Sequence, residues 1–487
     1  MRLKVKFLKI SAGRPVVFLH KNLAENSSIH VDERVILHKK SEKIIAVVDI
    51  ATGVLREDEI AVSTEVKKIM NLKEGEFLEV SPAPKPKSLS FIMKKLSCKK
   101  LSKKEIQEIM NDIVENHLTE SEIAFFISGV YECGMNMKET ADMIEAIVNS
   151  GKKLELNGQV ADKHSIGGVP GRTTPIVVSI CACTGLIIPK TSSRAITAPA
   201  GTADAVEVLC RVDFSIEELK KIVKKTNACL VWGGALNLAP ADDKIIQVEK
   251  LVNLDPEPQL LASILAKKLS VDAKYILIEI PYGKNAKVNK QKAEELSRKF
   301  KALAKHFHVK LECFLHETKE PVGKGIGPAL EIKDVIKVLK REDSCNHLEE
   351  ESLKVAGKLL ELTGKAEKSK GYLLAKKILE SGKAYQKFKE IILAQHGKLN
   401  GIKEADFKKD IFAEKKGTIS EINIKLINEL ARVLGCPSDK LAGMYLYKHL
   451  NDKVDKGDCI ATFYAESKEE LEEGIKFYKS RIPIIIK

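Results

Sequence analysis

A short proline-rich segment, Ser81–Ser88 (SPAPKPKS), divides the chain into two parts with different hydrophobic periods. Before it, β-rich runs such as Val35–Leu37 and Ile44–Val48 are separated by turn formers or charges, as is typical of strands. After it, capping boxes such as Ser102–Glu105 begin stretches with apolar residues at helical spacing. Because proline-rich segments form stiff linkers, we expect a β-rich domain before this boundary and a helical domain after it.

Beyond the helical region, helical and extended runs alternate. The helical pattern of Ala293–His306 follows the extended run Tyr275–Ile280, and Leu311–Leu315 is a further strand candidate. Such alternation is typical of an α/β domain, here with a largely parallel or mixed sheet. Near the C-terminus, a turn and strand over 456–464 precede an amphipathic helix over 469–478, which predicts a small α+β domain.

The formal net charge of +14 would suit a nucleic acid, an anionic substrate or only a lysine-rich surface. The excess positive charge is spread along the chain, and it forms no basic block interleaved with aromatic residues, which make up 5% of the sequence. We therefore expect a solvated lysine-rich surface and no nucleic-acid partner.

Ten cysteines in 487 residues are too few for a disulfide scaffold, so we expect mostly buried thiols, for example Cys133 and Cys313, and no metal site. The apolar runs stay shorter than the roughly 18 residues that a membrane span needs. The N-terminal residues lack the apolar block of a signal peptide. We therefore expect a cytoplasmic protein without a membrane partner.

The segment Asp162–Thr174 (DKHSIGGVPGRTT) combines several features of an anion site. Its paired glycines let backbone N–H groups approach an anion, and an apolar, helix-like run follows whose N-terminus adds partial positive charge. Lys163 supplies a point charge, and Ser165, Thr173 and Thr174 supply hydroxyl groups. A glycine pair alone would indicate only an ordinary turn, but this combination predicts anion binding.

A second segment, Lys190–Asp204, holds five hydroxyl groups and one arginine within fifteen residues. Such a loop can bind phosphate and sugar oxygens, although by itself it is equally typical of an exposed polar loop. Because the two segments flank one apolar, helix-like stretch, we expect them to share an anion pocket.

The two segments together resemble the thymidine phosphorylase and pyrimidine-nucleoside phosphorylase family. That family carries a Lys-His-Ser-x-Gly-Gly loop and a later Ser-x-Arg…Gly-Thr-x-Asp segment, which correspond to Lys163–Gly168 and Ser192–Asp204. The resemblance covers about residue 88 to the C-terminus. It continues in four further stretches, Pro240–Asp242, Ala262–Lys268, Gly325–Glu331 and Lys456–Asp458.

Within this superfamily, the sequence of 188–204 and the extra N-terminal β domain are similar to the archaeal AMP phosphorylase branch. That branch uses phosphate to cleave AMP into adenine and ribose 1,5-bisphosphate, and it also accepts CMP and UMP. Val248 stands where the pyrimidine-nucleoside enzymes place a base-binding arginine, which agrees with this branch. The loop Val169–Thr174 is shorter than is usual in the branch, so the donors at 172–174 stay open.

The resemblance implies a multidomain α/β fold, in which a helical domain in two pieces closes over the phosphate loop. It also implies a pentosyltransferase that forms a homodimer or higher homo-oligomer, with inorganic phosphate as a co-substrate and with neither cofactor nor metal. We expect an N-terminal β-rich domain over 1–84, a helical domain over 85–150 and 240–270, a large α/β domain with a mixed sheet over 151–239 and 271–410, and a small C-terminal α+β domain over 411–487.

The implied reaction is attack of phosphate on C1′ of the ribose, with a proton donated to the leaving base. The resemblance makes Asp255 the donor, and the alternative is a helix N-cap before Pro256. His164 is the other candidate acid, and the alternative is a structural histidine. The implied phosphate ligands are Lys163, Ser165, Thr174, Ser192 and Thr202, and the implied AMP-binding residues are Gly167, Ser193, Arg194, Ala195, Ile196, Thr197, Ala198, Thr202, Ser263, Lys267 and Lys287.

Three other functions stay open from the sequence. They are a thymidine or pyrimidine nucleoside phosphorylase, an anthranilate-type phosphoribosyltransferase with the same fold and a glycine-rich phosphate loop, and a basic nucleic-acid binder. Arg194, Lys267 and Lys287 are chemically suited to hold a 5′-phosphate, but no pattern selects among them.

Overall fold

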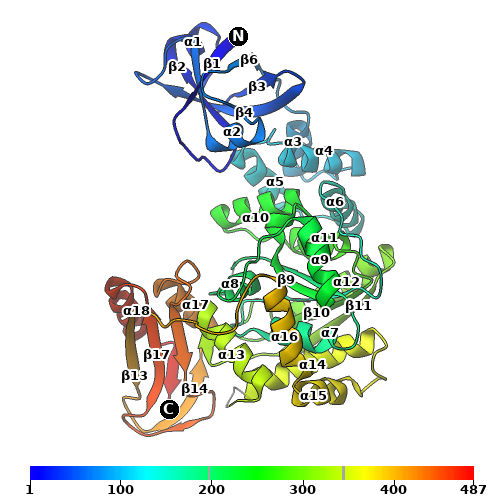
Figure 1. Cartoon of the computed structure of the whole chain (residues 1–487), viewed down its shortest axis with the longest axis vertical. Helices are drawn as coiled ribbons and strands as arrows, with labels where there is room; N and C mark the ends of the chain where they lie inside the picture. The colour runs from blue at the N-terminus through cyan, green and yellow to red at the C-terminus, as the bar shows by residue number, and fades with distance from the viewer. Residues whose placement is uncertain (196–197, 343–345) are drawn as a thin grey trace. The chain divides into compact units, whose positions relative to one another are not determined.

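The computed structural model describes residues 1–195, 198–342 and 346–487 (Figure 1). The chain forms two compact units. The first combines Met1–Gly151 with Ala239–Ala266, and the second combines Lys152–Leu238 with Lys267–Lys487. Among the described residues, no helix is both long and apolar enough to cross a membrane.

The N-terminal part of the first unit is a closed six-stranded barrel with the strand order β1-β5-β2-β4-β3-β6. Alternate residues of each strand point inward, and Val17, Leu37 and Leu78 are fully buried there. The strands are β1 (Arg2–Phe7), β2 (Val16–His20), β3 (Arg34–Lys39), β4 (Glu42–Ala51), β5 (Glu59–Val62) and β6 (Phe77–Pro82), with short helices α1 (Lys21–Asn26) and α2 (Thr64–Ile69).

The rest of the first unit is helical. The predicted capping boxes are confirmed, since Ser102, Thr119 and Asn136 each accept a backbone hydrogen bond from a glutamate three residues later. Helix α10 packs against α4 and α5. The helices are α3 (Ser88–Leu96), α4 (Lys103–Val114), α5 (Glu120–Cys133), α6 (Met137–Asn149), α10 (Pro240–Val252) and α11 (Glu257–Ser270), whose last four residues belong to the second unit.

One cysteine prediction is wrong in this helical region. Cys133 is not a buried thiol but forms a disulfide with Cys98, which follows α3. The two residues are 35 apart in sequence, and the packing of α3 against α5 brings them together. Cys313, by contrast, is unpaired and half-buried.

The second unit contains a five-stranded arrangement in the order β11-β10-β7-β8-β9, in which a single bridge between Val160 and Ile187 joins β7 to β8. Every described strand pair here is parallel, which corrects the expected mixed sheet. Helical crossovers return the chain to the same end of the sheet, and this connection produces parallel neighbours. The strands are β7 (Ala161–Ser165), β8 (Ile188–Ser192), β9 (Ala228–Trp232), β10 (Tyr275–Tyr282) and β11 (Lys310–Glu317).

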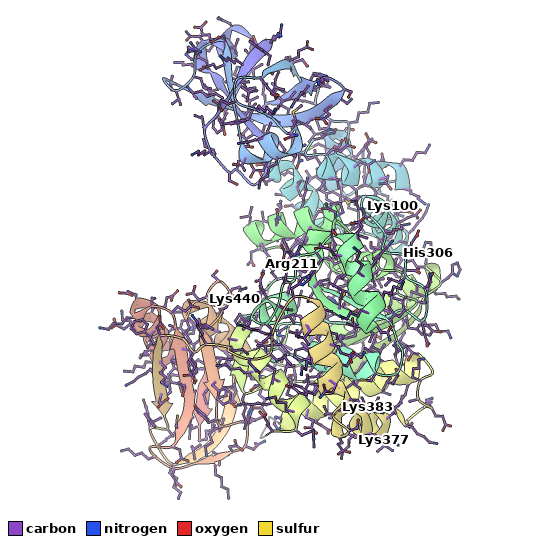
Figure 2. The ribbon with its side chains drawn as sticks, viewed as in Figure 1. Lys100, Arg211, His306, Lys377, Lys383 and Lys440 are labelled. Carbon is purple, nitrogen blue, oxygen red and sulfur yellow. A yellow bond between two sulfur atoms is a disulfide. The ribbon has the colours of Figure 1, made fainter. Side chains whose placement is uncertain are left out.

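Helices cover this sheet, and the core includes Ile176, Leu277 and Phe388, all fully buried. Helix α7 packs against α14 and α16, and α12 packs against β11. Lys377 and Lys383, by contrast, are exposed, as expected of a lysine-rich surface (Figure 2). The helices are α7 (Thr173–Ala182), α8 (Thr202–Glu207), α9 (Ile216–Thr226), the short 3₁₀ helix η1 (Gly233–Leu236), α12 (Lys290–His306), α13 (Pro328–Lys340), α14 (Asn346–Leu362), α15 (Gly371–Glu380) and α16 (Lys383–Ala394).

The C-terminal part of the second unit has the predicted α+β character. Two sheets, β12-β15-β17-β13 and β16-β14-β18, enclose a core that contains Phe463 and Leu434. Strand β12 precedes α13 in the chain, so the α/β part donates one strand to the C-terminal sheet. The elements are β12 (Gly325–Ile326), β13 (Phe407–Phe412), β14 (Gly417–Ile422), α17 (Ile424–Val433), β15 (Gly443–Leu446), β16 (Lys453–Val454), β17 (Cys459–Ala465), α18 (Lys468–Arg481) and β18 (Ile484–Ile486).

Candidate functional site

Both predicted anion-binding segments lie at the carboxyl ends of neighbouring parallel strands. Lys163, His164 and Ser165 are the last three residues of β7, and Ser192 is the last residue of β8. The Lys163 motif therefore begins inside a strand and continues as a loop to α7. In open α/β sheets, ligands bind beyond this edge, where successive loops and helix N-termini meet.

The ammonium group of Lys163 is buried and held in place by two side chains. Its Nζ donates to Glu279 Oε2 at 2.6 Å and to Thr173 Oγ1 at 3.0 Å. Glu279 lies on β10, the strand next to β7, and Thr173 is the first residue of α7. Burial alone would raise the pKa of Glu279, but the charge of Lys163 and the hydrogen bond from His316 lower that pKa to about 2.

Two more buried lysines lie beside this pair. Lys268 Nζ is 2.6 Å from Asp162 Oδ2, and Lys190 Nζ is 3.5 Å from Asp162 Oδ1. Burial lowers the pKa of Lys190 to about 7, although Asp162 opposes the shift. Three lysines therefore share two carboxylates, those of Asp162 and Glu279, and the cluster has an excess of positive charge when Lys190 is protonated.

The imidazole of His164 lies next to this cluster. Burial and the charges of Lys268 and Lys190 hold its pKa well below the usual range. A neutral imidazole has no acid proton to spare near neutral pH. This surrounding charge favours a structural or hydrogen-bonding role for His164 over that of the acid.

The loop between β7 and α7 is held by contacts with distant parts of the second unit. Arg172 pairs with buried Glu331 through Nε, and its Nη2 donates to Ala200 O at 2.6 Å, which ties the first segment to the second. Asn428 Nδ2 donates to Gly168 O at 2.7 Å. Arg172 therefore shapes the loop, and Thr174 is buried in the first turn of α7.

The second segment folds around the buried carboxylate of Asp204. Its Oδ2 accepts hydrogen bonds from Ala195 N at 2.7 Å and Gly201 N at 2.8 Å. Arg194 forms two hydrogen bonds of 2.7 Å to Glu207, and its guanidinium lies 4.9 Å from the centre of the Trp232 ring. The structure thus engages Arg194 in an ion pair.

At the end of β8, the hydroxyl groups of Thr191 and Ser192 are buried, and neither has a hydrogen-bond partner among the described residues. A buried hydroxyl without a partner is costly, so such groups indicate a missing ligand or water. Thr202 starts α8 and is buried, Ala198, Ser165 and Gly167 are half-buried, and Ser193 is exposed. The predicted residues Ile196 and Thr197 lie outside the described residues.

The first unit holds two of the predicted residues. Ser263 Oγ donates to Asp242 Oδ2 at 2.8 Å, and Gln259 donates to the other oxygen of that fully buried carboxylate. Asp255 is exposed and precedes α11, whose first helical hydrogen bond is accepted by Pro256 O. Val248 is buried within α10.

Lys267 and Lys287 belong to the second unit. Lys267 is half-buried on α11, and its charge contributes to lowering the pKa of His164. Lys287 is exposed in the turn that follows β10. The structure therefore places Lys163 and Ser192 at the carboxyl ends of neighbouring strands, and Lys287 follows the carboxyl end of β10, the strand next to β7.

Of the two residues that hold the Lys163 ammonium, Thr173 lies in the predicted anion segment, whereas Glu279 was not predicted. Glu279 is the only charged residue in the apolar run Tyr275–Ile280. Because a carboxylate in a buried strand needs a partner, this isolated charge was a detectable signal. Asp162 and Lys190 are the first residues of the two predicted segments, but no sequence pattern assigned them a role.

Within the described ranges, two groups of side chains have the chemistry of divalent metal ligands. In the first group, Glu279, His316 and Glu351, the ammonium of Lys163 already lies 2.6 Å from Glu279. In the second group, which also includes His347, Glu320 Oε2 accepts hydrogen bonds from His449 Nδ1 at 2.9 Å and from Leu450 N at 3.0 Å.

Comparisons with known proteins agree with this architecture. Residues 89–151 match the glycosyl transferase family helical bundle domain, residues 157–385 match the a/b domain of that family, and residues 418–485 match the pyrimidine nucleoside phosphorylase C-terminal domain. A solved anthranilate phosphoribosyltransferase from Thermus thermophilus is similar with a TM-score of 0.54 and 16% identity, over 63% of this chain and 99% of that chain. At that identity the likeness shows the fold alone.

Sequence relatives extend over the whole chain. The AMP phosphorylase of Methanocaldococcus jannaschii is 42% identical over 99% of this chain and 97% of its own length. The AMP phosphorylase of Pyrococcus furiosus is 42% identical over 100% of this chain and 98% of its own. That of Methanococcoides burtonii is 41% identical over 100% and 97%. The resemblance seen in the motifs is thus confirmed, and the chain belongs to the AMP phosphorylase family of the pyrimidine nucleoside phosphorylase superfamily.

Proposed function

We propose that this chain catalyses the phosphorolysis of AMP. Phosphate attacks C1′ of the ribose, the bond to adenine breaks, and ribose 1,5-bisphosphate and adenine are the products. CMP and UMP are alternative substrates in this proposal. The observation that carries it is a buried cluster of lysines beside the Ser192 hydroxyl, which has no hydrogen-bond partner in the part of the chain that the structure describes; the chain also matches AMP phosphorylases over its full length.

The phosphate site is built from the end of β7 and β8. Lys163 offers a fixed positive charge, and Ser192 offers a buried hydroxyl that has no partner among the described residues. The N-terminus of α7 points partial positive charge toward the same edge of the sheet. A phosphate bound there offsets the excess charge of the lysine cluster and favours the protonated form of Lys190. Ser165, Thr174 and Thr202 complete the proposed ligands.

Catalysis in this proposal uses the charge of the bound phosphate. The sugar becomes cation-like as the glycosidic bond breaks, and a nearby anion stabilises that transition state. Asp255 donates the proton to the leaving base. The residues proposed to bind AMP are Gly167, Ser193, Arg194, Ala195, Ile196, Thr197, Ala198, Thr202, Ser263, Lys267 and Lys287.

The test is phosphate-dependent release of base from AMP, compared with adenosine, thymidine and uridine. We expect activity on AMP and little on the nucleosides. Thymidine cleavage with inert AMP would instead assign a nucleoside phosphorylase, and dependence on pyrophosphate would assign a phosphoribosyltransferase. Changing Asp255→Asn should lower kcat by about 10²- to 10⁴-fold, as expected for loss of a general acid, with little change in the Kd of AMP. An unchanged kcat would remove Asp255 from the mechanism.

The assembly is part of the proposal as well. Sedimentation would test the homodimer or higher homo-oligomer, and limited proteolysis would test the four-domain boundaries. The reaction uses inorganic phosphate as a co-substrate and invokes no cofactor.

A further inference from the structure

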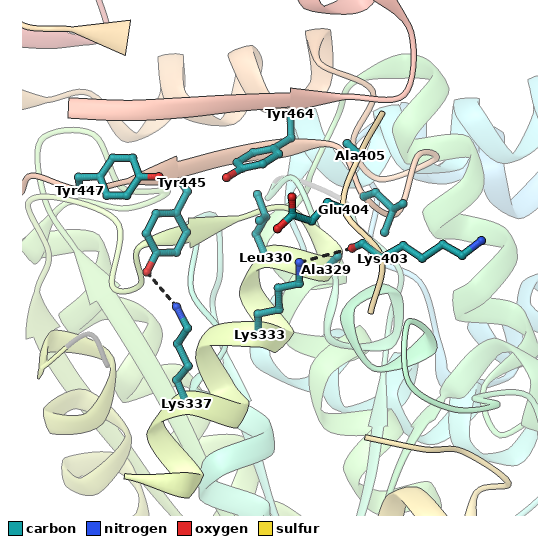
Figure 3. A pocket seen from close by; sticks show the side chains of 11 residues that line it. Ala329, Leu330, Lys333, Lys337, Lys403, Glu404, Ala405, Tyr445, Tyr447 and Tyr464 are labelled. Carbon is teal, nitrogen blue, oxygen red and sulfur yellow. Dashed lines mark hydrogen bonds between the residues drawn. The ribbon is translucent and has the colours of Figure 1, made fainter. Parts of the chain in front are cut away.

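A pocket of about 310 Å³ lies between helix α13 and the C-terminal sheet of the second unit (Figure 3). Helix α13 supplies Lys333 and Lys337 on one side, and the C-terminal sheet supplies Tyr445 and Tyr464 on the other. The residues that line it include none of those assigned to the phosphate and AMP site above. The volume lies in the range of pockets that bind small molecules.

The two lysines on α13 that line the pocket form no ion pair with a described carboxylate. Lys333 and Lys337 are one helical turn apart, and like charges at this spacing destabilise a helix. No carboxylate within the described parts of the chain lies at ion-pair distance from either ammonium. Among those parts, Lys333 Nζ donates to Lys403 O at 3.4 Å, and Lys337 Nζ donates to Tyr445 Oη at 3.3 Å. Burial and the charge of Lys337 lower the pKa of Lys333, although the charge of Glu404 opposes the shift.

The opposite wall is aromatic. The rings of Tyr445 and Tyr447 are 5.2 Å apart between centroids, and Figure 3 shows Tyr464 beside them. Burial raises the pKa of Tyr464 to about 12, so its phenol stays protonated and can donate a hydrogen bond. Aromatic faces stack on nucleobases of any type. Glu404, also in the lining, can accept hydrogen bonds from ribose hydroxyls or an exocyclic amine.

Two of the lining segments also hold the loops of the candidate active site. Leu330 precedes Glu331, which pairs with Arg172 in the loop after β7. Leu441 follows Lys440, whose Nζ lies 2.9 Å from Glu207 Oε2, and Glu207 in turn binds Arg194.

The two segments are also joined to each other, because Ala329 N donates to Lys440 O at 3.0 Å. A ligand that shifts either segment would therefore displace the partners of Arg172 and Arg194.

We propose that this pocket is a second nucleotide site, which binds a nucleoside monophosphate with its phosphate on Lys333 and Lys337 and its base against the tyrosines. Occupancy acts on the active-site loops through α13 and Lys440. This inference goes beyond the proposed reaction, because it assigns a second site for the nucleotide. Binding of AMP to that site can be measured without turnover.

The test is equilibrium binding of AMP to the full chain in phosphate-free buffer. We expect two AMP per chain for the wild type and one for the double variant Lys333→Ala/Lys337→Ala, because each lost charged hydrogen bond weakens binding by about tenfold or more. The control is Lys354→Ala/Lys358→Ala on α14, which removes the same charge at the same spacing from half-exposed lysines. It should keep both sites.

The outcomes separate the two proposals. A double variant that binds as much AMP as the wild type overturns the inference, and so does a wild type that binds no AMP. If the wild type binds one AMP that the double variant loses, the pocket is supported and the active-site proposal fails. Trp232, the single tryptophan, lies under Arg194, and a change in its fluorescence on AMP binding that the Lys333→Ala/Lys337→Ala variant lacks reports the coupling. Pocket binding without a change in that fluorescence overturns the coupling.

Discussion

Replacing Glu279 by glutamine tests whether the buried ion pair with Lys163 organises the phosphate site. The substitution keeps the size of the side chain and removes its charge. The pKa of Glu279 is lowered from 4.5 to about 2, and this shift corresponds to about 3 kcal/mol of stability. Removing one partner of a buried ion pair costs a similar amount, about 3–5 kcal/mol, because the other charge is left uncompensated.

The sign of the pH dependence follows from the direction of the shift. A carboxyl with a lowered folded-state pKa stabilises the fold fully above its unfolded pKa of 4.5, and this contribution is lost as the pH falls toward 2. The stability gap between wild type and Glu279→Gln should therefore be about 3 kcal/mol at pH 7 and should shrink below pH 5.

The assay is urea unfolding followed by the fluorescence of Trp232, which lies on β9 in the same unit. Glu294→Gln is the matched control, since Glu294 is an exposed glutamate on α12. We expect the control to stay within about 0.5 kcal/mol of the wild type. A loss below about 1 kcal/mol for Glu279→Gln, or a gap independent of pH, would refute the argument that this pair is strong.

Three further perturbations test other parts of the structure. Because burial lowers the pKa of Lys190 to about 7, the affinity for sulfate should fall as the pH rises from 6 to 8, where the charge of sulfate itself is constant. Lys190→Met should make the affinity independent of pH over this range. A wild-type affinity that does not change with pH would contradict the prediction. In Gly201→Ala the new Cβ would lie 2.5 Å from Ser193 O, so the loop must shift and the Kd of AMP measured by calorimetry should rise at least tenfold; an unchanged Kd would exclude the loop from the site. Changing Cys98→Ala should destabilise the helical region by about 4 kcal/mol from the loop entropy of a 35-residue separation, seen as a lower Tm that reductant no longer affects, and equal Tm values would count against the disulfide.

Local sequence signals located the parts of the site but not the contacts between them. The capping box at Ser102 depends on residues three apart, so the sequence contains all of its information. Lys163 and Glu279 are 116 residues apart, and Arg172 and Glu331 are 159 apart. Their pairing depends on the order of strands in the sheet, which no local pattern specifies.

The polar character of β7 explains why the first motif looked like a loop. Its sequence, ADKHS, lacks the apolar run expected of a buried parallel strand. Asp162 and Lys163 can be buried there only because Lys268 and Glu279 neutralise them. A strand stabilised by ion pairs across the fold shows no hydrophobic period, so sequence reasoning could find its chemistry but not its secondary structure.

The hydrogen bond from Asn428 to the carbonyl of Gly168 limits which parts of the chain can be removed without changing the phosphate loop. Strand β12 lies within the C-terminal sheet although the chain continues from it into α13. Cutting the chain after residue 410 would leave the edge of β12 without β15 and the turn of the phosphate loop without Asn428. The C-terminal part is therefore not a detachable module, and exchanging it between relatives would transplant a part of the anion site with it.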